Sequence, residues 1–298
     1  MSRATHPAAN REVESVPTVT RPADGESLSI GSGFSARSFR ARDMGLAMDP
    51  LVMVDHYVMT EPTFGTHPHA GLSAVSLIFE DSAGRFHNRD SLGNDFDLLP
   101  GDLYWLTAGR GALHDESPRE GSRIHGLQVF VNVPQQFRYE APSSLLVRRQ
   151  EMPVLSGSRH RVRVAVGESN GVAGATPPGL PMTILDGWLY DRGGFEHELG
   201  SGTNAWVQAI AGVVEVAIAG NRARLRKGQA IAVNNSESGK SITVRVSVGD
   251  QFPAQFALLA GQTVKEPYVQ QGPFVMGTSA EIEAINKEFN AGRFGSID

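Results

Sequence analysis

Two histidines, His67 and His69, flank a single proline in the stretch GTHPHAG, which starts at Gly65. In a helix, side chains two residues apart point in nearly opposite directions, whereas in a strand they share one face. The flanking glycines and Pro68 disfavour a helix at this point. The stretch is therefore predicted to be extended, with both imidazoles on one side, which is a common beginning of a metal site.

A second pair with the same spacing, His114 and Glu116, lies in the stretch TAGRGALHDESP. On a strand both side chains would face the interior and Asp115 would face the other way. If the strand contained a β-bulge, Asp115 could take the inward place of Glu116. The 44 residues between His69 and His114 leave room for about four strands at a spacing of roughly 8 to 12 residues. The chain could then return beside its start, so that His67, His69, His114 and Glu116 converge on one ion.

Three neutral imidazoles and one carboxylate form a nitrogen and oxygen donor set that suits iron, and also Mn, Cu, Ni or Zn. On a six-coordinate ion, four protein ligands leave positions for water, dioxygen or substrate, and such open positions permit catalysis. The alternative interpretation is that a buried histidine is a hydrogen-bonded core residue and not a metal ligand. We favour that interpretation for the isolated histidines His56, His87, His125, His160 and His197.

The glycines of TAGRGALH do not open a helix, so a turn that aims His114 inward is a simpler explanation than a phosphate-binding loop. The chain has no cysteine, which excludes disulfides, thiolate ligands and a cysteine nucleophile. No order of Ser, His and Asp and no acidic pair offers a competing mechanism.

The elements that must position these residues are predicted to be strands. Seven segments alternate apolar and polar residues or are rich in β-branched residues, namely AVSLIF, GDLYWLTA, HGLQVFVNV, HRVRVAV, WVQAIAGVVEVAIAG, QAIAVN and SITVRVSV. A long helix is predicted only near the C-terminus. There Thr278 and Glu281 form a capping box, and Gly292 ends the helical pattern. The fold class is therefore all-β, with sandwiches or barrels and one C-terminal helix.

An internal repeat indicates two related barrels. AVSLIFEDSAGRF followed by FDLLPGDLYWLTAG has the same order of strands and glycine turns as WVQAIAGVVEVAIAG followed by RARLRKGQAIAVN. At 298 residues the chain is also longer than one core usually supports. We predict a metal-binding domain at 1–138, a linker at 139–155, and a second barrel without metal ligands, carrying the helix, at 156–298.

Composition excludes other classes of function. The 27 basic residues against 32 acidic ones, a net charge of −5, offer no electrostatic surface for direct nucleic-acid binding. The polar opening MSRATHPAANREVES lacks the features of a secretory signal, and no apolar run reaches membrane-spanning length. We expect a cytoplasmic protein with no membrane contact. A chain that pairs two barrels is expected to be a monomer.

Four stretches, in this order, resemble the pirin family of two-barrel cupins: HPHAG, HNRDSLGN, PGDLYWLTAGRGALHDE and EPYVQQGPFVMGTSAEIEAINKEFNAGRFG. The resemblance runs from about Arg42 to the C-terminus and implies tandem double-stranded β-helix (jelly-roll) barrels. It implies that the metal, Fe(II) above the alternatives, is bound by His67, His69, His114 and Glu116, and that the second barrel has lost its metal. That barrel agrees, since it has no His-x-His pair.

The resemblance also implies a function. Several bacterial pirins resemble quercetin 2,3-dioxygenases, so the expected substrates are a flavonol and O2, with CO released and Glu116 as the catalytic base. The alternative is a redox-responsive iron module that acts on a protein partner, either a transcription factor or a metabolic enzyme; a metal-dependent isomerase or lyase is a third reading. Ala70 and Ser73 depart from residues common in the family, where Arg and an acidic residue are frequent. These departures affect expectations about the substrate more than about the metal.

Overall fold

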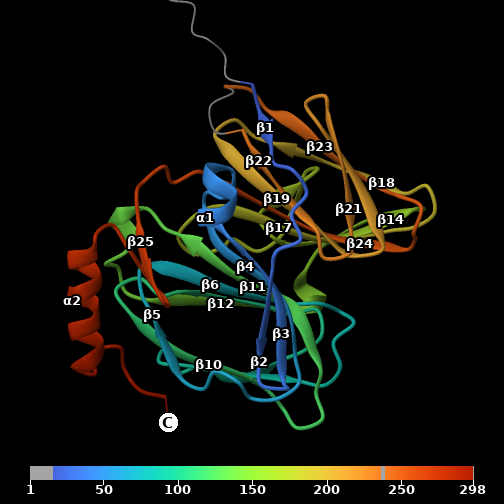
Figure 1. Cartoon of the computed structure of the whole chain (residues 1–298). Helices are drawn as coiled ribbons and strands as arrows, with labels where there is room; N and C mark the ends of the chain where they lie inside the picture. The colour runs from blue at the N-terminus through green and yellow to red at the C-terminus, as the bar shows by residue number, and fades with distance from the viewer. Residues whose placement is uncertain (1–15, 236–238, 298) are drawn as a thin grey trace, which may run out of the picture.

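The chain forms two β-barrels, as the sequence predicted, in a computed structural model that describes residues 16–235 and 239–297 (Figure 1). Each barrel is a sandwich of one large and one small antiparallel sheet. The polar opening discussed above, residues 1–15, lies outside the described residues. No helix in the described part of the chain is long and apolar enough to cross a membrane.

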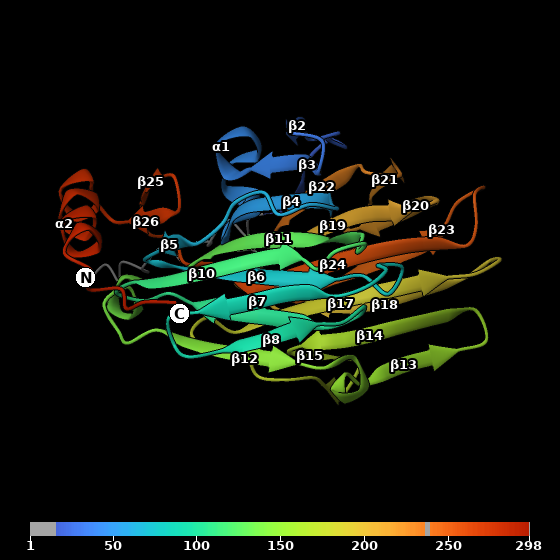
Figure 2. The same cartoon turned by 90° about the horizontal axis from the view of Figure 1, so that it is seen from below.

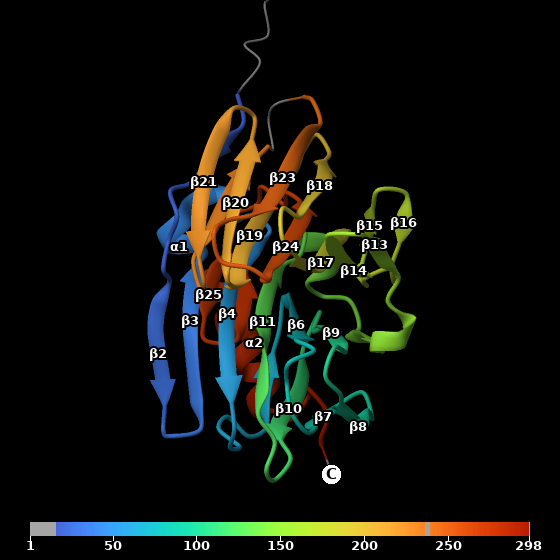
Figure 3. The same ribbon diagram turned by 90° about the vertical axis from the view of Figure 1, so that its right-hand side faces the viewer.

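The first barrel contains the predicted metal ligands. The order of its seven-stranded sheet is β12 (Ser143–Val147), β9 (Leu103–Thr107), β6 (Leu72–Ile78), β11 (Ile124–Asn132), β4 (Leu51–Met59), β3 (Phe34–Arg40) and β2 (Glu26–Ile30). The order of its four-stranded sheet is β5 (His67–His69), β10 (Ala112–Pro118), β7 (Phe86–Asp90) and β8 (Asp95–Leu98). Figure 3 shows the strands of the larger sheet side by side.

The second barrel repeats this order strand for strand. Its seven-stranded sheet runs β1 (Thr18–Val19), β22 (Ala230–Asn234), β19 (Thr203–Ala211), β24 (Ala254–Gln262), β17 (Met182–Leu189), β14 (His160–Val166) and β13 (Val154–Gly157). Its four-stranded sheet runs β18 (Gly194–Leu199), β23 (Ile242–Val248), β20 (Val213–Ile218) and β21 (Asn221–Arg226). Adding thirteen to each strand number from β4 to β11 gives the corresponding strand of the second barrel, and β3 and β2 correspond to β14 and β13. The weak internal repeat of the sequence is therefore a real structural repeat.

The edge strands cross the domain boundaries predicted from the sequence. β1 precedes the first barrel in the chain but pairs with β22 of the second. The segment predicted as a linker contributes β12 to the first barrel, through β9, and β13 to the second, through β14. Between them lies a single 3₁₀ turn, Arg149–Glu151. The edge of each sheet offers unpaired backbone N–H and C=O groups, and this segment pairs with them.

The two barrels pack against each other through their seven-stranded sheets. In β6 every residue is buried: Val75 and Leu77 face the second barrel, and Ala74, Ser76 and Ile78 face the interior of the first. The largest apolar core lies between the sheets, where residues of the first barrel meet others of the second, among them Phe39, Trp105, Ile184, Trp206 and Leu259. Strands buried on both faces read as continuous apolar runs, which is the pattern AVSLIF shows.

The C-terminal segment returns to the first barrel. The hairpin β25 (Val269–Gln271) and β26 (Phe274–Met276) and the helix α2 (Ser279–Asn290) lie beside β5, at one end of that barrel (Figure 2). One half of the predicted capping box is present, since the Thr278 hydroxyl oxygen accepts a hydrogen bond from the Glu281 backbone N–H; the Glu281 carboxylate accepts from the Thr278 hydroxyl and not from its backbone N–H. Ile282 and Ile285 bury their side chains against Ala70 and Phe274.

The remaining elements are short. They are α1 (Ala41–Met44), the 3₁₀ turns Gly45–Met48 and Gln135–Phe137, and the small hairpin of β15 (Glu168–Ser169) and β16 (Val172–Ala173).

Candidate metal centre

The strands β5 and β10 bring the two histidine motifs together. They pair antiparallel, with His114 directly opposite His67 and Ala112 opposite His69. Four strands, β6 to β9, lie between them in the chain, as the spacing predicted. β5 is at the edge of its sheet, where Pro68 can be accommodated although it lacks a backbone N–H.

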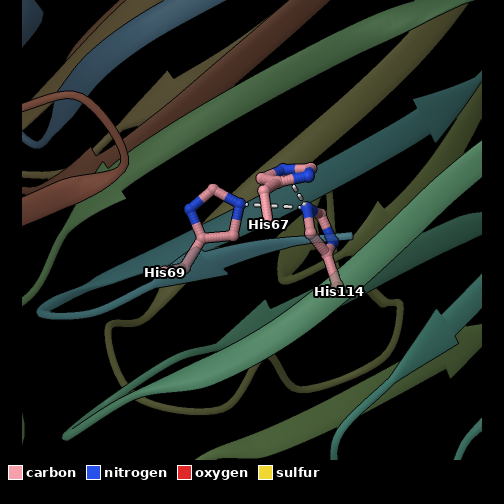
Figure 4. A group of neighbouring side chains, drawn as sticks. All are labelled: His67, His69 and His114. Atoms are coloured by element: carbon pink, nitrogen blue, oxygen red, sulfur yellow. Dashed lines mark hydrogen bonds between the residues drawn. The ribbon is translucent and has the colours of Figure 1, made fainter. Parts of the chain in front are cut away.

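The ring nitrogens of the three histidines converge on one point. Nε2 of His114 lies 2.8 Å from Nε2 of His67 and 2.9 Å from Nε2 of His69. Their potential ligand atoms all lie within 4.8 Å of one another (Figure 4). Among the described residues, these three form the group able to hold a metal ion.

Hydrogen bonding within the cluster fits a bound cation. Nδ1 of His67 lies 2.8 Å from the Gly65 carbonyl and must donate to it, so its Nε2 presents a lone pair to the centre. His114 can carry only one ring proton, which cannot satisfy both facing Nε2 atoms. Nδ1 of His114 is buried without a partner. Lone pairs that face one another in this way suit coordination to a metal, which binds the neutral imidazole.

Burial keeps the three histidines neutral. It lowers the pKa of His69 to about 3, with a further contribution from the neighbouring His67. It also lowers the pKa of His67 and holds that of His114 well below the usual value. Since each charged form is disfavoured by desolvation, the rings are ready to act as ligands at neutral pH.

Glu116 faces the same interior but lies outside the close group of histidines. Ser76 Oγ lies 2.7 and 2.8 Å from its two carboxylate oxygens. Burial raises the pKa of Glu116 to about 7, although the hydrogen bond from Ser76 opposes the shift. Asp115 points to the other side of the strand, where it accepts a hydrogen bond from Arg89 at 2.8 Å. The strand is therefore regular here, and Glu116, with the three histidines, remains the predicted ligand set.

A cavity of about 270 Å³ opens beside the cluster and is lined by His67, His69, His114 and Glu116. Its other walls are mainly apolar, including Phe34, Met53, Met59, Phe64, Phe86 and Phe130. The Phe130 ring lies edge-on to His69, with centroids 5.1 Å apart.

Sequence reasoning missed four polar residues of this pocket. They are Arg40, Asp55, Tyr57 and Gln128. Their only signal in the sequence is a polar residue at an inward position of an apolar strand, as in LVMVDHYVM. Burial raises the pKa of Asp55 and of Tyr57.

Three of the five isolated histidines are hydrogen-bonded residues of the interior, whereas His87 and His160 are partly exposed, and His87 bonds to Asp95. His56 and His125 bond to each other, and His197 bonds to Ser169. In the second barrel, β23 holds the place of β10, and its inward residues are Val244 and Val246. The interior there is filled by apolar side chains.

Comparison with known proteins assigns the family. The Pirin family model matches residues 24–131, and the model of the Pirin C-terminal cupin domain matches residues 184–295. The chain belongs to the pirin family. Rat Pirin is 30% identical over 249 residues, which cover 83% of this chain and 83% of the relative.

Three other matches cover 83% or more of this chain. A Vibrio cholerae protein that carries a provisional quercetin 2,3-dioxygenase name is 27% identical, over 96% of this chain and 98% of its own. The fold matches a structure named quercetin 2,3-dioxygenase from Acinetobacter baumannii, with TM-score 0.82, 24% identity, and coverage of 95% and 100%. It also matches a bacterial pirin of Escherichia coli in complex with nickel(II), with TM-score 0.62, 16% identity, and coverage of 83% and 99%.

Proposed function

We propose that this chain is a metal-dependent dioxygenase that opens the heterocyclic ring of quercetin-type flavonols, consuming O2 and releasing CO. The observation that carries the proposal is the apolar, aromatic-walled cavity that opens directly on the three histidines and Glu116. A flat aromatic substrate fits such walls because apolar burial and ring contacts both favour it. The provisional name of the Vibrio cholerae relative supports the same reaction.

In this proposal His67, His69 and His114 hold the ion, with Glu116 as the fourth ligand or in reach of it. Fe(II) is the proposed metal, and Mn, Cu, Ni or Zn would suit the same donors. When bound, the ion lowers the pKa of the flavonol 3-hydroxyl and holds substrate and O2 together. The aromatic walls exclude bulk water, which strengthens every electrostatic interaction at the centre.

Glu116 is the proposed general base. Its carboxylate takes the proton of the 3-hydroxyl, and Ser76 of the opposite sheet holds that carboxylate by a hydrogen bond. A base works best when its pKa is close to the operating pH, and burial raises the pKa of Glu116 to about 7.

The test uses protein loaded with Fe(II) under anaerobic conditions, mixed with quercetin and then exposed to air. We expect O2 uptake matched by CO release. Glu116→Gln should lower kcat by about 10²- to 10⁴-fold, the usual contribution of a general base. The control is Glu198→Gln, which changes an exposed carboxylate in the second barrel and should turn over like the wild type.

Metal content separates the roles of Glu116. If Glu116→Gln retains the ion and loses turnover, Glu116 acts as the base; if the ion is lost, Glu116 is chiefly a ligand. Absence of CO release from metal-loaded wild type would contradict the dioxygenase. Capture of a protein partner in only one iron oxidation state would then favour the regulatory module.

A further inference from the structure

The wall of the pocket that faces the histidines carries three polar side chains. The histidines belong to the four-stranded sheet, whereas Asp55 and Tyr57 on β4 and Gln128 on β11 belong to the seven-stranded sheet. Gln128 is directly opposite Asp55 in the β4–β11 ladder, and Tyr57 follows two residues along on the same face. Directly opposed side chains on neighbouring strands lie within reach of one ligand group.

Two of these groups are buried donors without a partner. Tyr57 is 3% exposed, and its hydroxyl makes no hydrogen bond within the described structure. Nε2 of Gln128 is likewise buried without a partner, although its Oε1 lies 2.9 Å from Ser76 Oγ. Unpaired buried donors are costly and therefore rare, so two in one cavity indicate a ligand that supplies oxygen acceptors.

Asp55 adds an acceptor beside these donors. Ser38 donates to its Oδ1 at 2.5 Å, and the Arg40 guanidinium lies 3.7 Å from the same atom. Both contacts fall on Oδ1, which leaves Oδ2 available beside Gln128. An adjacent donor and acceptor match a phenolic hydroxyl, which accepts from one and donates to the other.

The charges in the pocket narrow the class of ligand. Asp55 and Glu116 disfavour a carboxylate in this part of the cavity, and Arg40 disfavours an ammonium group. A neutral aromatic ring with hydroxyl groups satisfies the polar atoms and also the apolar walls around them.

We infer that Asp55, Tyr57 and Gln128 form a subsite that binds the ring hydroxyls of the substrate, at the part of the molecule remote from the histidines. The inference rests on the proposed function, because that function places the 3-hydroxyl of a flavonol at the histidines. Ser76 lies between Gln128 and Glu116, at 2.9 and 2.7 Å, so the subsite adjoins the proposed base. The subsite selects polyhydroxylated flavonols over those without ring hydroxyls.

The experiment compares quercetin with 3-hydroxyflavone, which keeps the 3-hydroxy-4-keto group but lacks the other hydroxyls. Dissociation constants are measured by calorimetry on metal-loaded protein without O2. The wild type should bind quercetin about tenfold or more tightly, since several hydrogen bonds distinguish the two ligands. Tyr57→Phe and Gln128→Leu should each weaken quercetin binding by about three- to tenfold and change 3-hydroxyflavone binding by less than about twofold.

Matched controls are Tyr190→Phe and Gln251→Leu, which make the same changes at exposed positions of the second barrel and should leave both constants unchanged. Metal content and thermal unfolding confirm that each variant is folded, and Tyr57→Phe removes only one oxygen atom. The subsite would be overturned if the wild type bound the two flavonols equally tightly or bound neither. It would also be overturned if the variants lost affinity for both flavonols to the same extent.

Failure of the subsite and failure of the proposed function give different results. Preference for quercetin without CO release would support the subsite and contradict the dioxygenase. CO release from both flavonols at equal affinity would support the dioxygenase and overturn the subsite.

Discussion

At the scale of single residues, neutrality and direction make the three histidines able to bind a metal ion. The Gly65 carbonyl determines which nitrogen of His67 carries the proton, and burial removes the charge from His69 and His114. A histidine held by a hydrogen bond at Nδ1 presents Nε2 as a lone pair, which is the usual way proteins orient this ligand. The cluster is therefore arranged for a cation before any ion binds.

Replacing one of these proposed ligands should abolish tight metal binding. His69 is 1% exposed, and its Nε2 faces Nε2 of His114. For His69→Ala we expect metal affinity to fall by more than the 10- to 100-fold that loss of a ligand's hydrogen-bonding partner costs, since a direct ligand is removed. Elemental analysis after dialysis against a weak chelator measures the change.

The control for that experiment is His87→Ala in the same barrel. His87 bonds to Asp95 on the neighbouring strand and lies outside the pocket. The His87→Ala variant should therefore retain the metal ion. Equal metal content in the His69 variant and the wild type would contradict the site.

The sequence predicted the three histidines because period-two spacing places both members of each pair on one strand face. It also placed Glu116 inward and Asp115 outward. It could not show that Ser76 holds Glu116, nor that Tyr57 and Gln128 line the pocket. Such residues come singly from separate strands, and only the ladder between β4, β11 and β6 brings them together.

At the scale of elements, the short strand β5 needs support from outside its own sheet. β10 pairs with one side of it, and the C-terminal hairpin supports the other, where Val275 N donates to the Ala70 carbonyl at 3.0 Å. About 200 residues separate these partners in the chain, which is why strand patterns alone could not predict the contact. The helix and its cap were predictable because capping signals are local.

The C-terminal hairpin approaches the backbone closely at Gly71, two residues after the end of β5. Its φ is +72°, and a Cβ added there would lie 1.9 Å from the Val275 carbonyl oxygen and 2.6 Å from the Met276 sulfur. Gly71→Ala should lower the free energy of unfolding by about 2 to 5 kcal/mol, from the left-handed backbone and the clash together. We also expect weaker metal binding, because the displaced hairpin lies beside His69.

Gly220→Ala separates the two effects. Gly220 has a φ of +82°, but an added Cβ would have no atom within 4 Å. Only the backbone cost, about 1 to 2 kcal/mol, should appear in urea unfolding, with metal affinity unchanged. Equal losses in the two variants would show that the hairpin does not press on Gly71.

At the scale of the whole molecule, a chain of polar groups crosses the apolar contact between the barrels. Nδ1 of His125 donates to Asp81 at 2.7 Å, so its Nε2 accepts from Nε2 of His56, also at 2.7 Å. Nδ1 of His56 then accepts from Gln208 of the second barrel at 3.4 Å. Every bond then runs in one direction, from Gln208 through His56 and His125 to Asp81, with no proton on Nδ1 of His56. The sequence predicted hydrogen-bonded core histidines here but could not predict that they pair across strands.

Acid should loosen this contact. Burial, and then the neighbouring His125, lower the pKa of His56 to about 3 from an unfolded value of about 6.5. Between these values the unfolded chain binds a proton that the folded chain does not. Stability therefore falls as the pH drops through this window, by up to about 1.4 kcal/mol per pH unit for one proton.

The variant His56→Gln isolates this effect. It removes the titrating ring but leaves Asp81, His125 and Lys227, the charged or titratable groups that act on it, in place. Urea unfolding of metal-loaded protein from pH 7.5 to 4.5 should show a shallower loss of stability for the variant, by up to about 1.4 kcal/mol per pH unit. At pH 7.5 the variant should be the less stable protein, because it loses the bond to His125. Parallel stability curves would mean that the histidine pair does not couple acid to the contact between the barrels.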